Sequence, residues 1–169
     1  MAATIGRDGQ RKEAMTQRVD YRKASPGALQ AMLGMENHVR QCGLEHSLLE
    51  LVKSRVSQIN GCAYCLDMHT KDARAAGETE QRLYLLAAWR ETTFYSERER
   101  AALAWAEALT QLPGREISDE LYGQVRRHFD EKSIVDLTLA IIAINGWNRL
   151  AIPFRSEAGS YQPPSARAG

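Results

Sequence analysis

The chain has 169 residues, of which 44% are hydrophobic and 25% charged, and its 22 Lys and Arg against 21 Asp and Glu leave a formal net charge of +1. These values are typical of an ordinary globular domain, and they argue against disorder, a fibrous repeat and the basic surface of a nucleic-acid-binding protein. We expect one helical domain at residues 18–155, between a flexible N-terminal extension (1–17) and a C-terminal tail (156–169).

The sequence gives no sign of export or of membrane insertion. Residues 1–17 contain no apolar core of the length that a secretory signal requires. The longest apolar run, Leu137 to Ile144 with its flanking residues, is shorter than the roughly 20 residues that span a bilayer. We therefore expect a cytoplasmic protein without membrane contact. In that reducing compartment a close cysteine pair is more often catalytic or metal-binding than a structural disulfide.

Helix-forming residues dominate the chain, and no strand pattern persists, so we predict an all-α fold. The predicted helices cover, approximately, residues 26–41, 48–60, 62–76, 79–90, 97–112, 119–129 and 132–150. Local signals fix several ends, among them Ser25-Pro26 at a start, Gly61 at an end and the capping box of Ser96 and Glu99. The last helix is apolar nearly all round, which indicates a place in the middle of a bundle. Pro153 and the Pro163-Pro164 tail are expected to close the fold.

The most informative segment is Cys62, Cys65 and His69, which reads C-x-x-C-x-x-x-H at the start of the third predicted helix. At about 100° per residue these three side chains fall on one helix face, with Asp67 and Lys71 on the opposite face. The first turn of a helix presents unpaired N–H groups and the positive end of the helix dipole, which stabilise a thiolate. A second sulfur three residues away can capture a sulfenic acid as a disulfide. This pattern favours thiol redox chemistry in a pocket.

Two further residues are candidates for proton transfer. His69 lies one helical turn beyond Cys65, so it can exchange a proton with that thiol, and we expect it to lower the pKa of Cys65. Glu50 lies on the preceding helix, opposite the apolar stripe and beside Ser54 and Ser57. Periodicity alone therefore predicts that Glu50 is a solvated surface carboxylate.

Other interpretations of the same residues remain open. Cys62, Cys65 and His69 could be three ligands of a structural zinc site, which usually needs four, and Cys42 and His46 are the nearby residues that could complete it. A metal-binding or oligomeric interaction protein with structural thiols is the corresponding alternative function. A third possibility is a cofactor-free lyase in which His69 is the base.

Glu50, eleven intervening residues and then Cys62-Ala-Tyr-Cys65-Leu-Asp-Met-His69 resemble the Glu, C-x-x-C, His signature of AhpD-like alkylhydroperoxidases, in the carboxymuconolactone decarboxylase family. The resemblance is strongest at residues 48–90, and residues 144–149 are similar to a segment common in that family. It implies an all-α bundle of about seven helices that assembles into trimers or hexamers. It also implies a peroxidase or disulfide reductase that needs no bound cofactor.

The resemblance further implies a role for each residue. Cys65 attacks the hydroperoxide, Cys62 resolves the sulfenic acid, and His69 with Glu50 relays protons, while electrons come from an unidentified thiol or lipoyl-bearing protein. Tyr64 stands where the best-understood members have a second histidine. A phenol is a poorer base at neutral pH, so we expect Tyr64 to donate a hydrogen bond instead. The intact C-x-x-C pair argues against the decarboxylase activity that gives the family its name.

Overall fold

The computed structural model describes residues 16–164, and these contain helices and no strand. In chain order the elements are α1 (Tyr21–Ala24), α2 (Pro26–Gln41), α3 (His46–Asn60), α4 (Ala63–Ala75), α5 (Glu80–Leu85), the 3₁₀-helix η1 (Leu86–Glu91), α6 (Glu97–Thr110), α7 (Asp119–Arg126) and α8 (Glu131–Phe154). The predicted all-α fold is confirmed, with the short α1 as an element that the sequence reasoning missed. Most of the expected N-terminal extension (1–15) and the end of the expected tail (165–169) lie outside the described residues.

Predicted helix ends agree with the structure where a local cap determines them. The Ser96 hydroxyl accepts a hydrogen bond from the Glu99 amide, and the Glu99 carboxylate accepts one from the Ser96 amide, so the capping box is present. Gly61 ends α3 in the left-handed conformation, with φ of 68°, which a residue without Cβ adopts at no steric cost. The next amide, that of Cys62, donates to the Ser57 carbonyl at 3.0 Å.

Two predictions near helix ends are wrong. The segment 79–90 is not one α-helix, because α5 ends at Leu85 and continues as η1, with Ala88 outside helical geometry. Tertiary contacts override helix propensity here, since Trp89 is buried and its indole N–H donates to Glu107 on α6 at 2.9 Å. The last helix was predicted to end at about Leu150, but it continues to Phe154, so Pro153 lies in its final turn.

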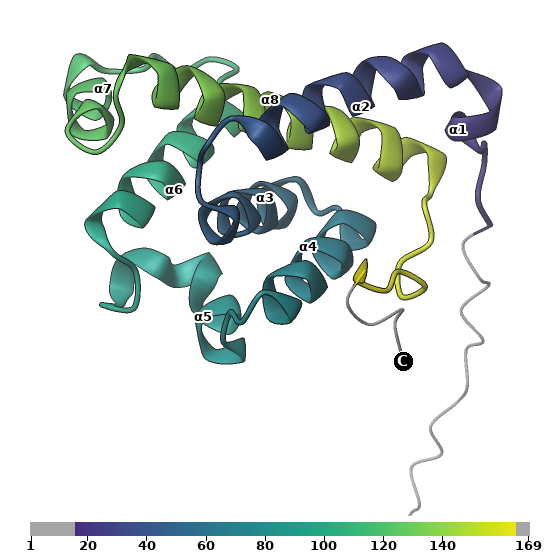
Figure 1. The fold of residues 1–169 in the computed structure, drawn as a ribbon, viewed down its shortest axis with the longest axis horizontal. Helices are drawn as coiled ribbons and strands as arrows, with labels where there is room; N and C mark the ends of the chain where they lie inside the picture. Colours follow the sequence, from purple (N-terminus) through teal and green to yellow (C-terminus); the bar gives the residue numbers. More distant parts are fainter. Residues whose placement is uncertain (1–15, 165–169) are drawn as a thin grey trace, which may run out of the picture.

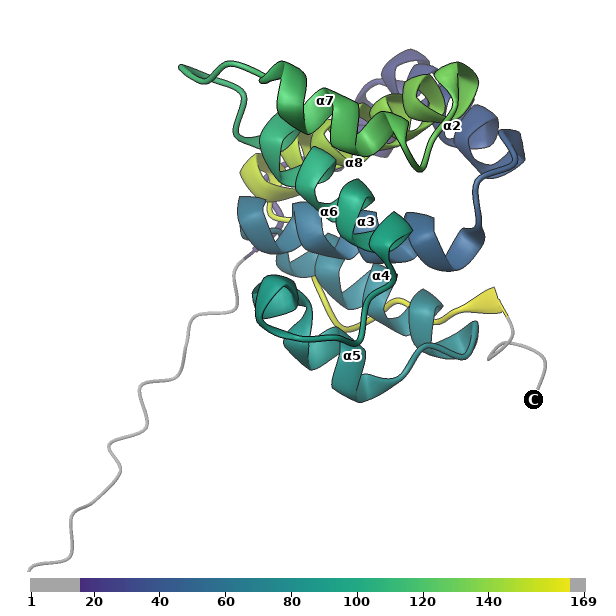
Figure 2. The same ribbon diagram turned by 90° about the vertical axis from the view of Figure 1, so that its left-hand side faces the viewer.

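Helix α3 lies at the centre of the bundle. Figure 1 shows it end-on, with α2 and α8 above it, α6 to its left and α4 below it. Figure 2 shows the same layers from the side, with α5 at the bottom. Because α3 packs against α4, α6 and α8, it is buried on nearly all sides rather than along one stripe. Polar side chains on this helix are therefore enclosed.

Helix α8 is longer than predicted. It has 24 residues, and by length and composition alone it could cross a membrane. In the structure it packs against α2, α3, α4 and α6, with Leu137, Ile141 and Ile144 in the main apolar core. These contacts are those of a core helix, as its apolar character predicted.

Candidate active site

The two cysteines meet at the start of α4. Cys62 is the N-cap residue, and its sulfur accepts a hydrogen bond from the Cys65 amide at 3.4 Å. Both thiols are free, and their sulfurs are in hydrogen-bond contact at 2.7 Å, farther apart than the roughly 2.05 Å of a disulfide bond. Cys62, Cys65 and His69 are all buried, so α4 turns the predicted face inward.

His69 is bound to Glu50 of α3. The ring Nδ1 and the carboxylate Oε2 lie 2.8 Å apart, and both side chains are at least nine-tenths buried. The prediction of a solvated Glu50 from periodicity is therefore wrong, because α3 is enclosed on the side that carries Glu50 as well as on its apolar stripe. With Nδ1 bound to the carboxylate, Nε2 is the nitrogen that can exchange a proton with a molecule beside the ring.

A buried row of alternating charges continues from this pair. Lys53 Nζ donates to Glu36 Oε1 at 2.5 Å and lies 4.0 Å from Glu50 Oε1. Burial raises the pKa of Glu50, but the hydrogen bond and charge of His69, with the charge of Lys53, lower it below its ordinary value. Burial likewise raises the pKa of Glu36, and Lys53 reverses that shift. The sequence reasoning missed Lys53 and Glu36, although a lysine within the apolar stretch of α3 was a signal for a buried ion pair.

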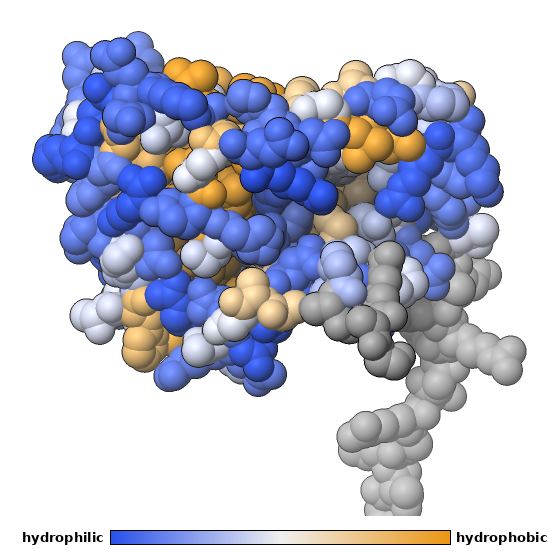
Figure 3. Space-filling view, in the orientation of Figure 1, coloured by the Kyte–Doolittle hydropathy of each residue, from blue (hydrophilic) through white to orange (hydrophobic). Residues whose placement is uncertain are grey.

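A cavity of about 690 Å³ lies between α1 and α2 on one side and α4 with the C-terminal segment on the other. Figure 3 shows this face hollowed between the part of the surface formed by α2 and the part formed by α4. Cys65, His69, Glu50 and Lys53 line the cavity, whereas Cys62 is not among its lining residues. The remaining wall is largely apolar, with Leu29, Leu33, Leu44, Leu49, Met68 and Trp147. The volume is within the usual range of small-molecule sites, about 300 to 1,000 Å³.

The ligand set expected for a zinc site does not assemble. In the part of the chain that the structure describes, the group of three that could hold a metal ion is Glu50, His69 and Asp72, with ligand atoms within 4.8 Å of one another. Neither cysteine belongs to that group. The thiols are therefore paired with each other rather than with His69.

Comparisons with known proteins agree on the family. Residues 26–108 match the profile of the Carboxymuconolactone decarboxylase family. The uncharacterized protein YdfG of Bacillus subtilis (strain 168) is 49% identical over 146 residues, which cover 86% of this chain and 99% of YdfG. The chain belongs to the carboxymuconolactone decarboxylase family. The resemblance stated from the Glu, C-x-x-C, His signature is thus confirmed.

Solved structures of similar proteins show the same fold as this family member. A protein of unknown function from Agrobacterium tumefaciens, suggested to be the antioxidant defence protein AhpD, is 44% identical with a TM-score of 0.83, over 86% of this chain and all of that one. The debrominase Bmp8 is similar in fold, with a TM-score of 0.73 at 21% identity, over 82% of this chain and 74% of Bmp8.

In this member of the carboxymuconolactone decarboxylase family, the cysteine with the lowered pKa is Cys62. The hydrogen bond from Cys65 lowers the pKa of the Cys62 thiol to about 7. The same hydrogen bond, burial and the charge of Cys62 raise the pKa of Cys65 above its ordinary value. The expectation that His69 lowers the pKa of Cys65 is therefore wrong, because the nearer sulfur dominates. Of the two sulfurs, Cys62 is therefore the one that loses its proton more readily.

Asn148 of α8 is a polar neighbour of both cysteines that the sequence reasoning did not single out. Its carbonyl oxygen accepts from the Asn60 amide at 2.8 Å, and its own amide donates to the Ser57 hydroxyl at 3.3 Å. A side-chain hydrogen bond from Asn148 lowers the pKa of Cys62 and that of Cys65. The position of Asn148 in the sequence could have indicated this role, because a side-chain amide on the buried face of an apolar helix needs hydrogen-bond partners.

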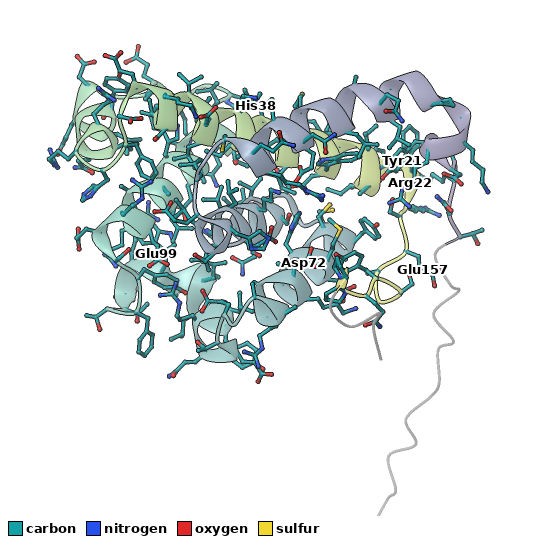
Figure 4. The ribbon with its side chains drawn as sticks, in the orientation of Figure 1. Tyr21, Arg22, His38, Asp72, Glu99 and Glu157 are labelled. Carbon is teal, nitrogen blue, oxygen red and sulfur yellow. The ribbon has the colours of Figure 1, made fainter. Side chains whose placement is uncertain are left out.

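Tyr64 lies at the α1 end of the cavity. Its hydroxyl accepts a hydrogen bond from Arg22 Nη2 at 2.9 Å, and the guanidinium lies 5.8 Å from the Tyr64 ring centroid. Figure 4 shows Tyr21 and Arg22 together on α1, with Asp72 lower down on α4. Tyr64 therefore helps to position α1 over the cavity.

Proposed function

We propose that the protein is a thiol-dependent peroxidase or disulfide reductase of the AhpD-like type, acting through Cys62 and Cys65. The observation that carries this proposal is the sulfur pair, 2.7 Å apart and buried, at the edge of a cavity that Cys65 shares with the His69–Glu50 pair. Nucleophile, resolving thiol and proton carrier are thus within one site. A family member with 44% identity has been suggested to be AhpD, which supports the same activity.

Cys65 is the attacking sulfur in this proposal, because it lines the cavity and Cys62 does not. Because the pKa of Cys65 is raised, its proton passes to the Cys62 thiolate, 2.7 Å away, in the same step as the attack, and Cys62 acts as the base. In that step the Cys65 sulfur bonds to the terminal peroxide oxygen as the O–O bond breaks. The alkoxide that leaves takes a proton held by the His69–Glu50 pair and departs as an alcohol.

Cys62 completes the oxidation. The proton that Cys62 took from Cys65 passes to His69 and replaces the proton given to the alkoxide. The Cys62 sulfur then attacks the sulfur of the Cys65 sulfenic acid, and hydroxide leaves with that proton as water. Overall, a thiolate, a thiol, one proton from the His69–Glu50 pair and a hydroperoxide give a disulfide, an alcohol and water. Two electrons and two protons from an external thiol or lipoyl-bearing protein regenerate the pair. A cytoplasmic location fits this cycle, because thiols are kept reduced there.

The test is a thiol count before and after one equivalent of an alkyl hydroperoxide, followed by mass mapping of any disulfide. We expect the loss of two thiols and a Cys62–Cys65 disulfide. In the Cys65→Ser variant, the remaining thiols should not be oxidised rapidly. In the Cys62→Ser variant, oxidation should stop at a sulfenic acid on Cys65 that can be trapped. Unchanged thiols in the native chain would reject the proposal. One zinc per chain in elemental analysis, lost in the double Cys→Ser variant, would favour the metal-binding alternative.

We also propose that the protein self-associates into a trimer or hexamer. Large apolar side chains on α7 and α8 are exposed in the single chain, including Tyr122, Val135 and Ile142 at 46%, 65% and 52%. Val135 and Ile142 are two helical turns apart on α8 and so lie on one face of that helix, where exposed apolar side chains fit an interface. A second copy of the chain is the partner that the family resemblance implies.

A further inference from the structure

The C-terminal segment, residues 156–164, lies against α4 although it forms no long helix. Arg155 ends α8 in the left-handed conformation, with φ of 55°, and the chain then turns back. Figure 1 shows the segment, in yellow, descending from α8 to run beside α4. The expected tail is therefore, over these residues, a packed part of the domain.

Four hydrogen bonds hold the segment to one side of α4. Lys71 Nζ donates to the carbonyls of Gly159 and Tyr161 at 3.3 and 3.1 Å. The Gly159 amide donates to Asp67 Oδ2 at 3.0 Å, and the Tyr161 hydroxyl donates to Asp72 Oδ1 at 2.6 Å. Asp67 and Lys71 are the residues that the helix pattern placed opposite the cysteines. The segment thus covers the outer side of α4 and reaches from there to the cavity.

The end of the segment is a wall of the cavity. Tyr161, Pro163 and Pro164 line it together with Cys65, and Pro163 is buried. Two prolines give this wall a stiff backbone, and the tyrosine ring gives it a broad apolar surface. Cys65 is only 1% exposed with this wall in place. The segment that hydrogen bonds hold against α4 therefore forms one side of the cavity from which the Cys65 sulfur is reached.

We propose that residues 156–164 determine specificity by setting the size of the molecules that reach Cys65. Slender organic hydroperoxides fit beside the tyrosine and prolines, whereas fused ring systems meet the wall. The identity of the substrate as a hydroperoxide rests on the proposed function. The size restriction itself does not, because it applies to any reagent that attacks or is attacked by the Cys65 sulfur.

The test compares alkylation of Cys65 by a small reagent, iodoacetamide, and a bulky one, N-(1-pyrenyl)maleimide. It uses full-length protein in which Cys42 and Cys62 are serine, so that Cys65 is the only thiol. The ratio of the two rates cancels any change in the thiolate fraction. We expect the rate with the bulky reagent, divided by the rate with the small one, to rise about tenfold in Tyr161→Ala and in a chain ending at Ser156. In both variants the Tyr161 ring and its hydrogen bond to Asp72 are lost.

Tyr84→Ala is the matched control. The Tyr84 hydroxyl also donates to a carboxylate, Glu80 Oε2 at 3.0 Å, but Tyr84 is exposed and does not line the cavity. The ratio of the two alkylation rates should not change in Tyr84→Ala. If the shortened chain does not fold, Tyr161→Ala decides alone. A rise of less than about threefold in every folded variant overturns the proposal.

A peroxide measurement separates this inference from the proposed function. If the native chain turns over hydroperoxides, Tyr161→Ala should shift its preference from ethyl hydroperoxide toward a bulkier aryl hydroperoxide. Native protein that does not turn over any hydroperoxide would refute the peroxidase function. The ratio of alkylation rates would still test whether residues 156–164 restrict access to Cys65.

Discussion

Replacing Lys53 with methionine tests whether the buried charge row is as tightly coupled as its geometry indicates. The Lys53 side chain is 4% exposed, and its ammonium lies 2.5 Å from Glu36 and 4.0 Å from Glu50. Methionine keeps an unbranched apolar stem of similar length. Removing the cation leaves two carboxylates enclosed without their shared partner, a change that typically costs about 3–5 kcal/mol of folding stability.

The cost should depend on pH in a defined direction. In the native chain the pKa of Glu36 is lowered, so its pairing stabilises the fold above the unfolded carboxyl pKa of about 4.3 and is lost as the pH falls through the lower folded pKa. In Lys53→Met burial dominates and raises that pKa, so Glu36 becomes neutral at higher pH. The stability difference between variant and native chain is therefore greatest near pH 7 and shrinks toward pH 4.

Urea denaturation followed by far-ultraviolet circular dichroism measures this difference, at one fixed protein concentration because association also contributes to stability. The double variant Glu36→Gln, Lys53→Met should recover part of the loss, since it removes a buried charge together with its partner. Lys23→Met, at a lysine whose side chain is 87% exposed, is the control and should be neutral. A Lys53→Met variant within about 1 kcal/mol of the native chain at pH 7 would refute the reasoning.

Three further predictions follow from the site and its surroundings. The rate of Cys62 alkylation should rise with pH, with a midpoint at about pH 7. Asn148→Leu should move that midpoint to higher pH, because a hydrogen-bond donor to the thiolate is lost, and an unchanged midpoint would contradict this role of Asn148. Gly61→Ala should cost about 1–2 kcal/mol in urea denaturation, from backbone strain at φ of 68° alone, because an added Cβ would meet nothing within 4 Å. Ile142→Glu should convert the proposed assembly to a helical monomer near 18.9 kDa in sedimentation, and a native chain already at that mass would contradict self-association.

Sequence reasoning succeeded where a feature depends on neighbours along the chain. The ends of α3 and α6 follow from Gly61 and from the Ser96–Glu99 pair, whose geometry is local. The inward face of α4 follows from the spacing of its cysteines and His69. Each of these rests on helical periodicity or on a cap, which three or four adjacent residues determine.

The same reasoning failed where a feature depends on packing. Periodicity predicted a solvated Glu50, because it cannot tell a helix with one buried stripe from a helix enclosed by its neighbours. Glu36 and Lys53 come from different helices, so the sequence can indicate that Lys53 needs a buried partner but not that the partner is Glu36. The pKa order of the cysteines depends on a sulfur contact and on Asn148, which is more than eighty residues away in the chain.

The wall of residues 156–164 has an evolutionary consequence. Apart from Pro163, each of these residues is exposed or half-buried, and none belongs to the apolar clusters of the bundle. Substitutions there remove little buried area, so they leave the thiol pair and the helices that hold it intact. If residues 156–164 restrict access as we propose, selection can alter which compounds enter the cavity by changing this one segment, without changing the residues around Cys65.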